Sequence, residues 1–120
     1  MKNLTIEDIQ KFADSMHERF IHDAEPIGSR EMAYGRMVKV SEEVGELADA
    51  VLSSFKRQRV DKPDTSGELG SEMADVILAV AVLARGLDIN IETALQDKME
   101  KILKRNIQIF KKIFPDKMFS

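Results

Sequence analysis

Pairs of carboxylates three residues apart occur in two segments that have helical periodicity. The segment "EEVGELADA" carries Glu43 and Glu46, and the segment "SEMADVILAVAVLA" carries Glu72 and Asp75. Residues three apart are neighbours on the surface of an α-helix, so each pair presents two carboxylates on one side. Mg²⁺ and Mn²⁺ prefer oxygen ligands, and four such groups on two antiparallel helices could bind one of these cations. The alternative for "EEVGELADA" is a solvent-exposed helix face without a ligand.

The second pair lies in the more apolar of the two segments. Every residue from 73 to 84 except Asp75 is apolar, so we expect this helix to be covered by protein on most sides. An ionised carboxylate in such a place is costly unless a cation compensates it, and neighbouring carboxylates repel each other. Di-iron bundles need Glu-x-x-His pairs, but neither His17 nor His22 lies in these segments. Magnesium therefore fits better than iron, and its usual phosphate ligand indicates nucleotide chemistry.

Four helices must position these residues. Apolar periodicity, with glycine and proline between the segments, predicts helices over residues 5–22, 29–59, 66–85 and 91–114. Thr5 with Asp8 is expected to begin the first helix, and Asn90 to cap the fourth. Gly86 is placed to end the third helix. No segment alternates as a strand would, so the sequence predicts an all-α four-helix bundle that forms a single domain over residues 1–120.

Composition narrows the class of protein. The 120 residues carry a net charge of −3, without the basic surplus of a nucleic-acid-binding protein. The absence of cysteine excludes disulfides and thiolate metal sites. The N-terminal "MKNLTIEDIQKF" lacks the apolar core of a signal peptide, and the apolar run at residues 76–84 is too short to span a bilayer. We therefore expect a cytoplasmic protein that has neither nucleic acid nor membrane as a partner.

The spacing and surroundings of the four acids resemble a known family. Glu43-x-x-Glu46, then 25 residues, then Glu72-x-x-Asp75, followed by "GLDINIETALQDKMEK", resembles the MazG-like nucleotide pyrophosphohydrolases of the all-α NTP pyrophosphatase superfamily, over residues 10–106. The resemblance implies that the four acids bind Mg²⁺, with Mn²⁺ as an alternative, and that the metal bridges a nucleoside triphosphate. Water would attack the α-phosphorus, giving a nucleoside monophosphate and pyrophosphate. Glu42 matches members with a doubled glutamate and is a candidate base; a solvent-facing role is the alternative.

The resemblance also implies residues that bind the substrate. Lys98, Lys101 and Arg105 are spaced to share one face of the fourth predicted helix, and Lys98 and Arg105 match basic positions that hold phosphate in the family. The alternative is a solvated basic face. Ile102 stands where some members carry an asparagine, which departs from the pattern.

On the first predicted helix, "MHERF" is similar to the His-x-x-Phe of members that cleave dCTP. His17 is therefore a candidate contact to a base, with a half-exposed histidine as the alternative. Phe20 is expected to be a core residue.

Two other functions stay open, namely a phosphoribosyl-ATP pyrophosphohydrolase and a non-catalytic helical interaction protein. For the main hypothesis, house-cleaning of non-standard or excess nucleotides is the expected role. Apolar residues on the third and fourth predicted helices exceed what one bundle needs, so a homodimer or homotetramer is expected.

Overall fold

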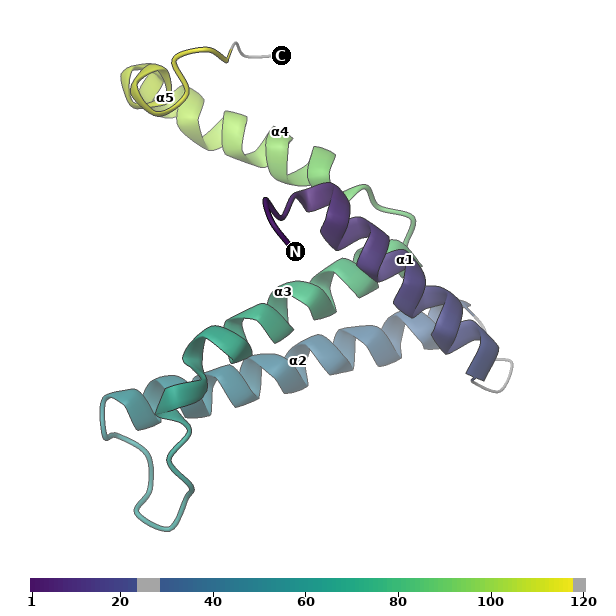
Figure 1. Ribbon diagram of the computed structural model, residues 1–120, viewed down its shortest axis with the longest axis vertical. Coiled ribbons are helices and arrows are strands. Elements are labelled where there is room, and N and C mark those ends of the chain that lie inside the picture. The colour runs from purple at the N-terminus through teal and green to yellow at the C-terminus, as the bar shows by residue number, and fades with distance from the viewer. Residues whose placement is uncertain (24–28, 118–120) are drawn as a thin grey trace. The chain divides into compact units, whose positions relative to one another are not determined.

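The computed structural model describes residues 1–23 and 29–117. Within these ranges the chain forms helices and turns and contains no strand, which confirms the predicted all-α fold. The chain forms two compact units, Met1–Ile89 and Asn90–Ser120. In chain order the helices are α1 (Ile6–Asp23), α2 (Ser29–Ser54), the 3₁₀ turn η1 (Ser66–Glu68), α3 (Leu69–Gly86), α4 (Ile91–Leu103), the 3₁₀ turn η2 (Lys104–Asn106) and α5 (Ile107–Ile113) (Figure 1).

Side-chain caps fix the helix starts that the sequence predicted. The Asp8 backbone N–H donates to Thr5 Oγ1 at 3.1 Å, and the Thr5 backbone N–H donates to Asp8 Oδ2 at 3.0 Å, so the two residues cap α1 reciprocally. These hydrogen bonds also hold the pKa of the Asp8 carboxyl below its ordinary value. At the start of α4, the Thr93 N–H donates to Asn90 Oδ1 at 3.0 Å. Both predicted caps are therefore confirmed.

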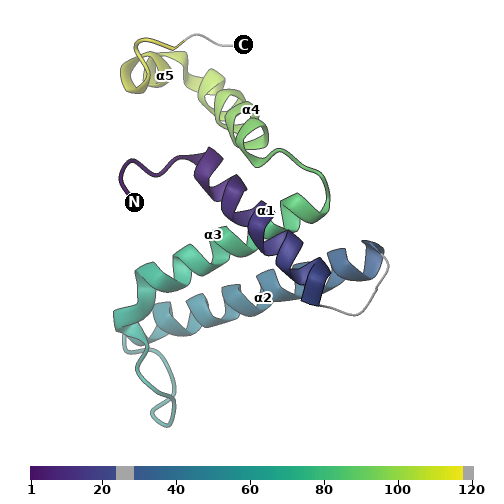
Figure 2. The same ribbon diagram turned by 45° about the vertical axis from the view of Figure 1, so that its right-hand side comes forward.

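Helices α1, α2 and α3 form the first unit. Helices α2 and α3 run antiparallel and side by side, and α1 packs across α3 (Figures 1 and 2). Small residues dominate the interior of this unit, because small side chains let helices approach closely. The buried apolar residues are Ala13, Val40, Ala50, Ala81 and Ala84.

Helix α3 is covered over only part of its length. Ala81 and Ala84 are buried, but towards the N-terminal end Met73 is 49% exposed and Ile77 is 57% exposed. The expectation that protein surrounds this helix on most sides is therefore wrong for its N-terminal half within the single chain. None of the helices in the described ranges has both the length and the apolar character to cross a membrane.

Two helix boundaries differ from the predictions. Helix α2 ends at Ser54 instead of continuing to Arg59, because the backbone at Lys56 turns into the left-handed region (φ 55). In the second unit, η2 interrupts the predicted fourth helix, and α5 then leaves in a new direction (Figure 2). The Ile109 N–H donates to the Asn106 side chain at 3.3 Å, so this asparagine caps a new helix where continuation was expected.

Candidate metal centre and adjoining pocket

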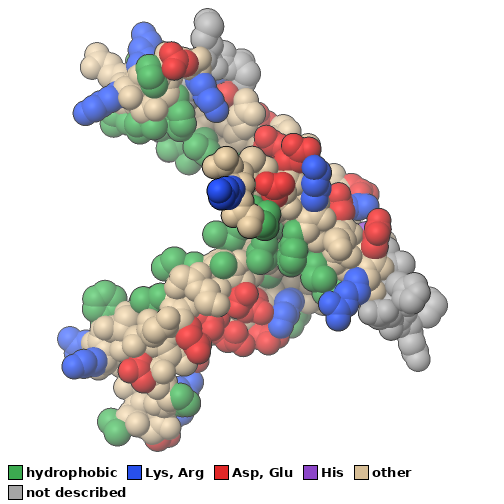
Figure 3. Space-filling view, viewed as in Figure 1, with side chains coloured by type: hydrophobic (Ala, Val, Ile, Leu, Met, Phe, Trp, Pro, Cys, Tyr) green, Lys and Arg blue, Asp and Glu red, His purple; other side chains and the backbone are tan. Residues whose placement is uncertain are grey.

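Three carboxylates converge between α2 and α3. Glu43 and Glu46 on α2 and Glu72 on α3 each offer an oxygen, and the three oxygens lie within 4.8 Å of one another. Acidic side chains gather over these two helices in the space-filling view (Figure 3). Mg²⁺ binds oxygens at about 2.1 Å in an octahedron, so its ligands lie up to about 4.2 Å apart. The cluster therefore needs only small side-chain movements to bind one such ion.

Burial of the carboxylates supports this assignment. Glu43 is only 9% exposed. Its Oε2 atom and the Oε2 atom of Glu72 are buried and have no hydrogen-bond partner in the part of the chain whose side chains the structure describes. A buried carboxylate oxygen without a partner is costly, and a bound cation would remove that cost. The donor set, made only of oxygens, fits Mg²⁺ or Mn²⁺.

The raised pKa values of two acids in the cluster also support a cation site. Burial raises the pKa of the Glu72 carboxyl, and the charges of Glu46 and Asp75 raise it further. The pKa of Glu46 is also raised, first by the charge of Glu43. Like charges held close together disfavour the ionised forms unless a cation neutralises them. The cluster is therefore a site of concentrated negative charge that favours a cation.

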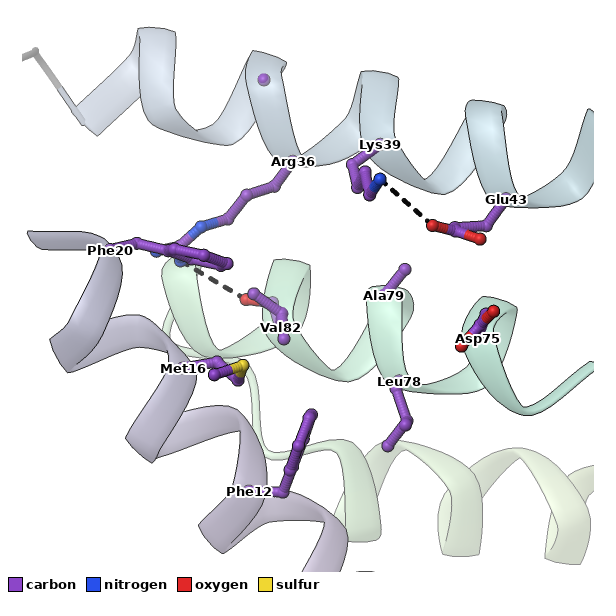
Figure 4. Close-up of a pocket in the computed structure, with 11 residues that line it drawn as sticks. Phe12, Met16, Phe20, Arg36, Lys39, Glu43, Asp75, Leu78, Ala79 and Val82 are labelled. Atoms are coloured by element: carbon purple, nitrogen blue, oxygen red, sulfur yellow. Dashed lines mark hydrogen bonds and ion pairs between the residues drawn. The ribbon is translucent and has the colours of Figure 1, made fainter. Parts of the chain in front are cut away.

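Asp75 lies beside the cluster but is not one of its three convergent groups. It is exposed on α3 and faces the same end of a pocket as Glu43, on the opposite helix (Figure 4). Of the four predicted ligands, the structure thus brings three together and places the fourth on the adjoining wall.

Lys39 connects the cluster to Glu42. Its Nζ atom lies 3.2 Å from Glu43 Oε1 and 3.3 Å from Glu42 Oε1. The hydrogen bond to Glu43 is the main reason that the pKa of Lys39 is raised. Glu42 itself is exposed next to the cluster. Lys39 was not predicted from the sequence, although its spacing of three and four residues from the two glutamates was a usable signal.

A pocket of about 330 Å³ opens from the acidic cluster between α1, α2 and α3. Glu43 and Asp75 lie at one end, and Phe20 with Arg36 lies at the other (Figure 4). Phe20 is 45% exposed and lines the pocket, so the expectation of a core phenylalanine is wrong. The full lining is Phe12, Met16, Phe20, Gly35, Arg36, Lys39, Glu43, Asp75, Leu78, Ala79 and Val82.

His17 lies near this pocket but is not one of its lining residues. It is half-buried on α1, and its buried Nδ1 atom has no partner in the described part of the chain. Burial lowers the pKa of His17, and the positive charges of Arg36 and Arg85 lower it further. These effects favour the neutral imidazole.

The predicted phosphate-binding residues lie in the second unit, Asn90–Ser120. Lys98 and Lys101 are exposed neighbours on α4. Arg105 is exposed in η2, beyond the end of α4. The continuous helical face that was predicted for the three residues is thus interrupted by the 3₁₀ turn.

Comparison with known proteins places this architecture in a family. The family model of the MazG nucleotide pyrophosphohydrolase domain matches residues 36–110, a range that contains all four acids. A similar protein is the "Uncharacterized protein YvdC" of Bacillus subtilis (strain 168), which is 37% identical over 81 residues, covering 60% of this chain and 76% of that protein. No solved structure matches significantly. With the family model spanning more than half of its length, the chain belongs to the MazG nucleotide pyrophosphohydrolase domain family.

Proposed function

We propose that this protein is a nucleoside triphosphate pyrophosphohydrolase that depends on Mg²⁺, with Mn²⁺ as a substitute. It cleaves the bond between the α- and β-phosphates and releases a nucleoside monophosphate and pyrophosphate. The observation that carries the proposal is the convergence of Glu43, Glu46 and Glu72 within 4.8 Å, with two buried oxygens that lack a partner. Membership of the MazG family gives this cluster its chemical context.

The residues around the cluster have separable roles. Glu43, Glu46 and Glu72 hold the metal, and Asp75 on the adjoining wall is the fourth ligand. When bound, Mg²⁺ supplies neutralisation of the phosphate charge and a lowered pKa of bound water.

Glu42 accepts the proton of the attacking water as a general base. The water oxygen forms a bond to the α-phosphorus, and the bond to the bridging oxygen breaks, so pyrophosphate leaves. Lys39 orients Glu43 through the 3.2 Å ion pair.

Basic residues and the pocket complete the substrate site in this proposal. Lys98, Lys101 and Arg105 bind the triphosphate, as the family resemblance implies. The pocket between α1, α2 and α3 receives the base, because it is mainly apolar and begins at the acids. His17 acts close to the base as a hydrogen-bonding group.

We also propose that two or four copies of the chain assemble. Met73, which follows Glu72 in the sequence, and Ile77, four residues further along α3, are 49% and 57% exposed. Burying such apolar side chains against a second copy is favourable, and a symmetric helix contact is the simplest arrangement. The expected setting is the cytoplasm, with house-cleaning of non-standard or excess nucleotides as the role.

A substrate panel tests the proposal. The protein is incubated with ribo- and deoxyribonucleoside triphosphates and with phosphoribosyl-ATP, in Mg²⁺, in Mn²⁺ and in EDTA. We expect metal-dependent pyrophosphate together with a monophosphate product, and no orthophosphate. Stepwise release of orthophosphate would contradict cleavage at the α-phosphorus. A preference for phosphoribosyl-ATP alone would favour the alternative of a phosphoribosyl-ATP pyrophosphohydrolase, and no product at all would favour an interaction protein.

A further inference from the structure

Arg36 is a buried cation with unused hydrogen-bonding capacity. The residue is only 8% exposed, and its Nη1 atom donates to the Val82 carbonyl oxygen at 3.4 Å. Its Nη2 atom is buried without a hydrogen-bond partner in the described ranges. Among the side chains that the structure describes, which leave out residues 21–28, no acidic group lies within ion-pair distance of Arg36. Because such a group is costly to bury, an acceptor other than the described side chains is the expected complement, and a ligand in the pocket can supply it.

Two contacts and the space at a glycine place the guanidinium at the wall of the pocket. Its central carbon lies 5.9 Å from the centroid of the Phe20 ring, a cation–π distance. The carbonyl of Val82 holds Nη1. Gly86 leaves the space that Nη1 occupies, since a Cβ atom at this position would collide with it. The donor is thus held in place before any ligand binds, and it lines the same pocket as Glu43 (Figure 4).

The distance along the pocket matches a nucleotide. Arg36 and Glu43 are seven residues apart on α2, which corresponds to a rise of about 10 Å between their backbones. The Arg36 side chain extends further, to Gly86, which is eleven residues or about 16 Å along α3 from Asp75. A span between these two values is comparable with the length of a nucleoside that carries two or three phosphates. A nucleotide whose phosphates lie at the acidic end therefore places the outer edge of its base near Arg36 and Phe20.

We propose that Arg36 is a specificity-determining residue that selects bases with a carbonyl oxygen on the edge remote from the sugar. Uracil, thymine, guanine and hypoxanthine carry this oxygen, whereas cytosine and adenine carry an amino group there. A guanidinium only donates hydrogen bonds, so it pairs with a carbonyl and opposes an amino group. This inference deepens the proposed function and rests on it for the position of the phosphates.

Matched substrate pairs test the inference. Pyrophosphate release is compared for dUTP against dCTP and for ITP against ATP, pairs that differ in the carbonyl or amino group at the outer edge. The pocket accepts pyrimidines, purines or both. Within each accepted pair, we expect kcat/KM of the wild type to be about 10- to 100-fold higher for the nucleotide whose base carries the carbonyl oxygen. In Arg36→Met this ratio should fall to within about threefold of unity, as expected when the single discriminating hydrogen bond is removed.

Two further variants separate selectivity from folding. Gly86→Ala keeps the arginine and improves the helix propensity of α3, but it displaces the guanidinium; the carbonyl preference should therefore shrink while the melting temperature is maintained. Arg30→Met, at an exposed arginine of α2, should leave the preference unchanged. If Arg36→Met and Gly86→Ala both retain the wild-type ratio, or if the wild type shows no carbonyl preference, the inference is overturned.

A binding measurement distinguishes this inference from the proposed function. Saturation-transfer NMR of deoxyuridine, deoxycytidine, inosine and adenosine needs neither metal nor turnover. We expect the wild type to bind the carbonyl nucleoside of a pair more tightly, and Arg36→Met to bind both members equally. If no triphosphate yields pyrophosphate but this difference is seen, the proposed function fails and the role of Arg36 stands. If the wild type releases pyrophosphate but binds the two nucleosides of a pair equally, or binds neither, the proposed function stands and the role of Arg36 is overturned.

Discussion

Replacing Glu72 with glutamine should abolish catalysis without unfolding the protein. The substitution keeps the shape of the side chain and removes one of the three charges that lie within 4.8 Å of one another. In EDTA, the variant should be at least as stable as the wild type, because the neighbouring carboxylates no longer repel a charge at this position. In Mg²⁺, pyrophosphate release should fall at least about 100-fold, since the metal loses an anionic ligand.

The thermal effect of Mg²⁺ gives this prediction a magnitude. The cluster belongs to the unit Met1–Ile89. A unit of this length unfolds with an entropy of roughly 190 cal/mol/K, so 1 kcal/mol shifts Tm by about 5 °C. At a Mg²⁺ concentration ten times Kd, binding stabilises the folded state by about 1.4 kcal/mol, and Tm of the wild type should rise by about 7 °C. If Glu72→Gln weakens binding about tenfold, the same concentration should raise Tm by only about 2 °C.

Differential scanning fluorimetry and a pyrophosphate assay on the same samples measure both effects. Glu18→Gln is the matched control, because it makes the same chemical change at an exposed position of α1. The control should keep the full Mg²⁺ shift and full activity. Near wild-type activity of Glu72→Gln would remove this residue from the site. A large loss of Tm in EDTA would instead show that the carboxylate stabilises the fold.

Three further predictions follow from the same geometry. Glu42→Gln should lower kcat by about 10²- to 10⁴-fold while leaving the Mg²⁺-induced rise of Tm unchanged; an equal loss of that rise would make Glu42 a ligand instead of a base. Because the pKa values of Glu46 and Glu72 are raised in the folded state, the stability that this cluster contributes is greatest below pH 4.5 and is lost as pH rises through the raised values. In EDTA, the Tm advantage of Glu72→Gln over the wild type should therefore grow between pH 4.5 and pH 7.5, and a constant difference would refute the repulsion. Ile77→Glu should convert an oligomer into monomers in sedimentation velocity, whereas an active wild-type species near 13.6 kDa would contradict assembly.

Local interactions explain what the sequence determined by itself. Helical periodicity, together with caps such as Thr5 with Asp8 and Asn90, depends on residues close together in the chain, so the all-α class and these helix starts could be predicted. The acid pairs were visible for the same reason, because residues three apart on a helix are neighbours in any tertiary context. Helix ends were less predictable. The left-handed turn at Lys56 and the competing cap at Asn106 break helices whose apolar pattern continues.

Only the packing of the helices decided how the candidate site is composed. The rotation of α3 against α2 brings Glu72 to Glu43 and Glu46 while it leaves Asp75 on the pocket wall, although both acids have similar spacing in the sequence. Arg36 looked like an ordinary charged residue of a long helix. Its burial requires the Phe20 ring from α1 and the space at Gly86 on α3. Contacts between three helices that are distant in the chain leave no periodic signal, because they depend on crossing angles and side-chain volumes that the tertiary structure sets.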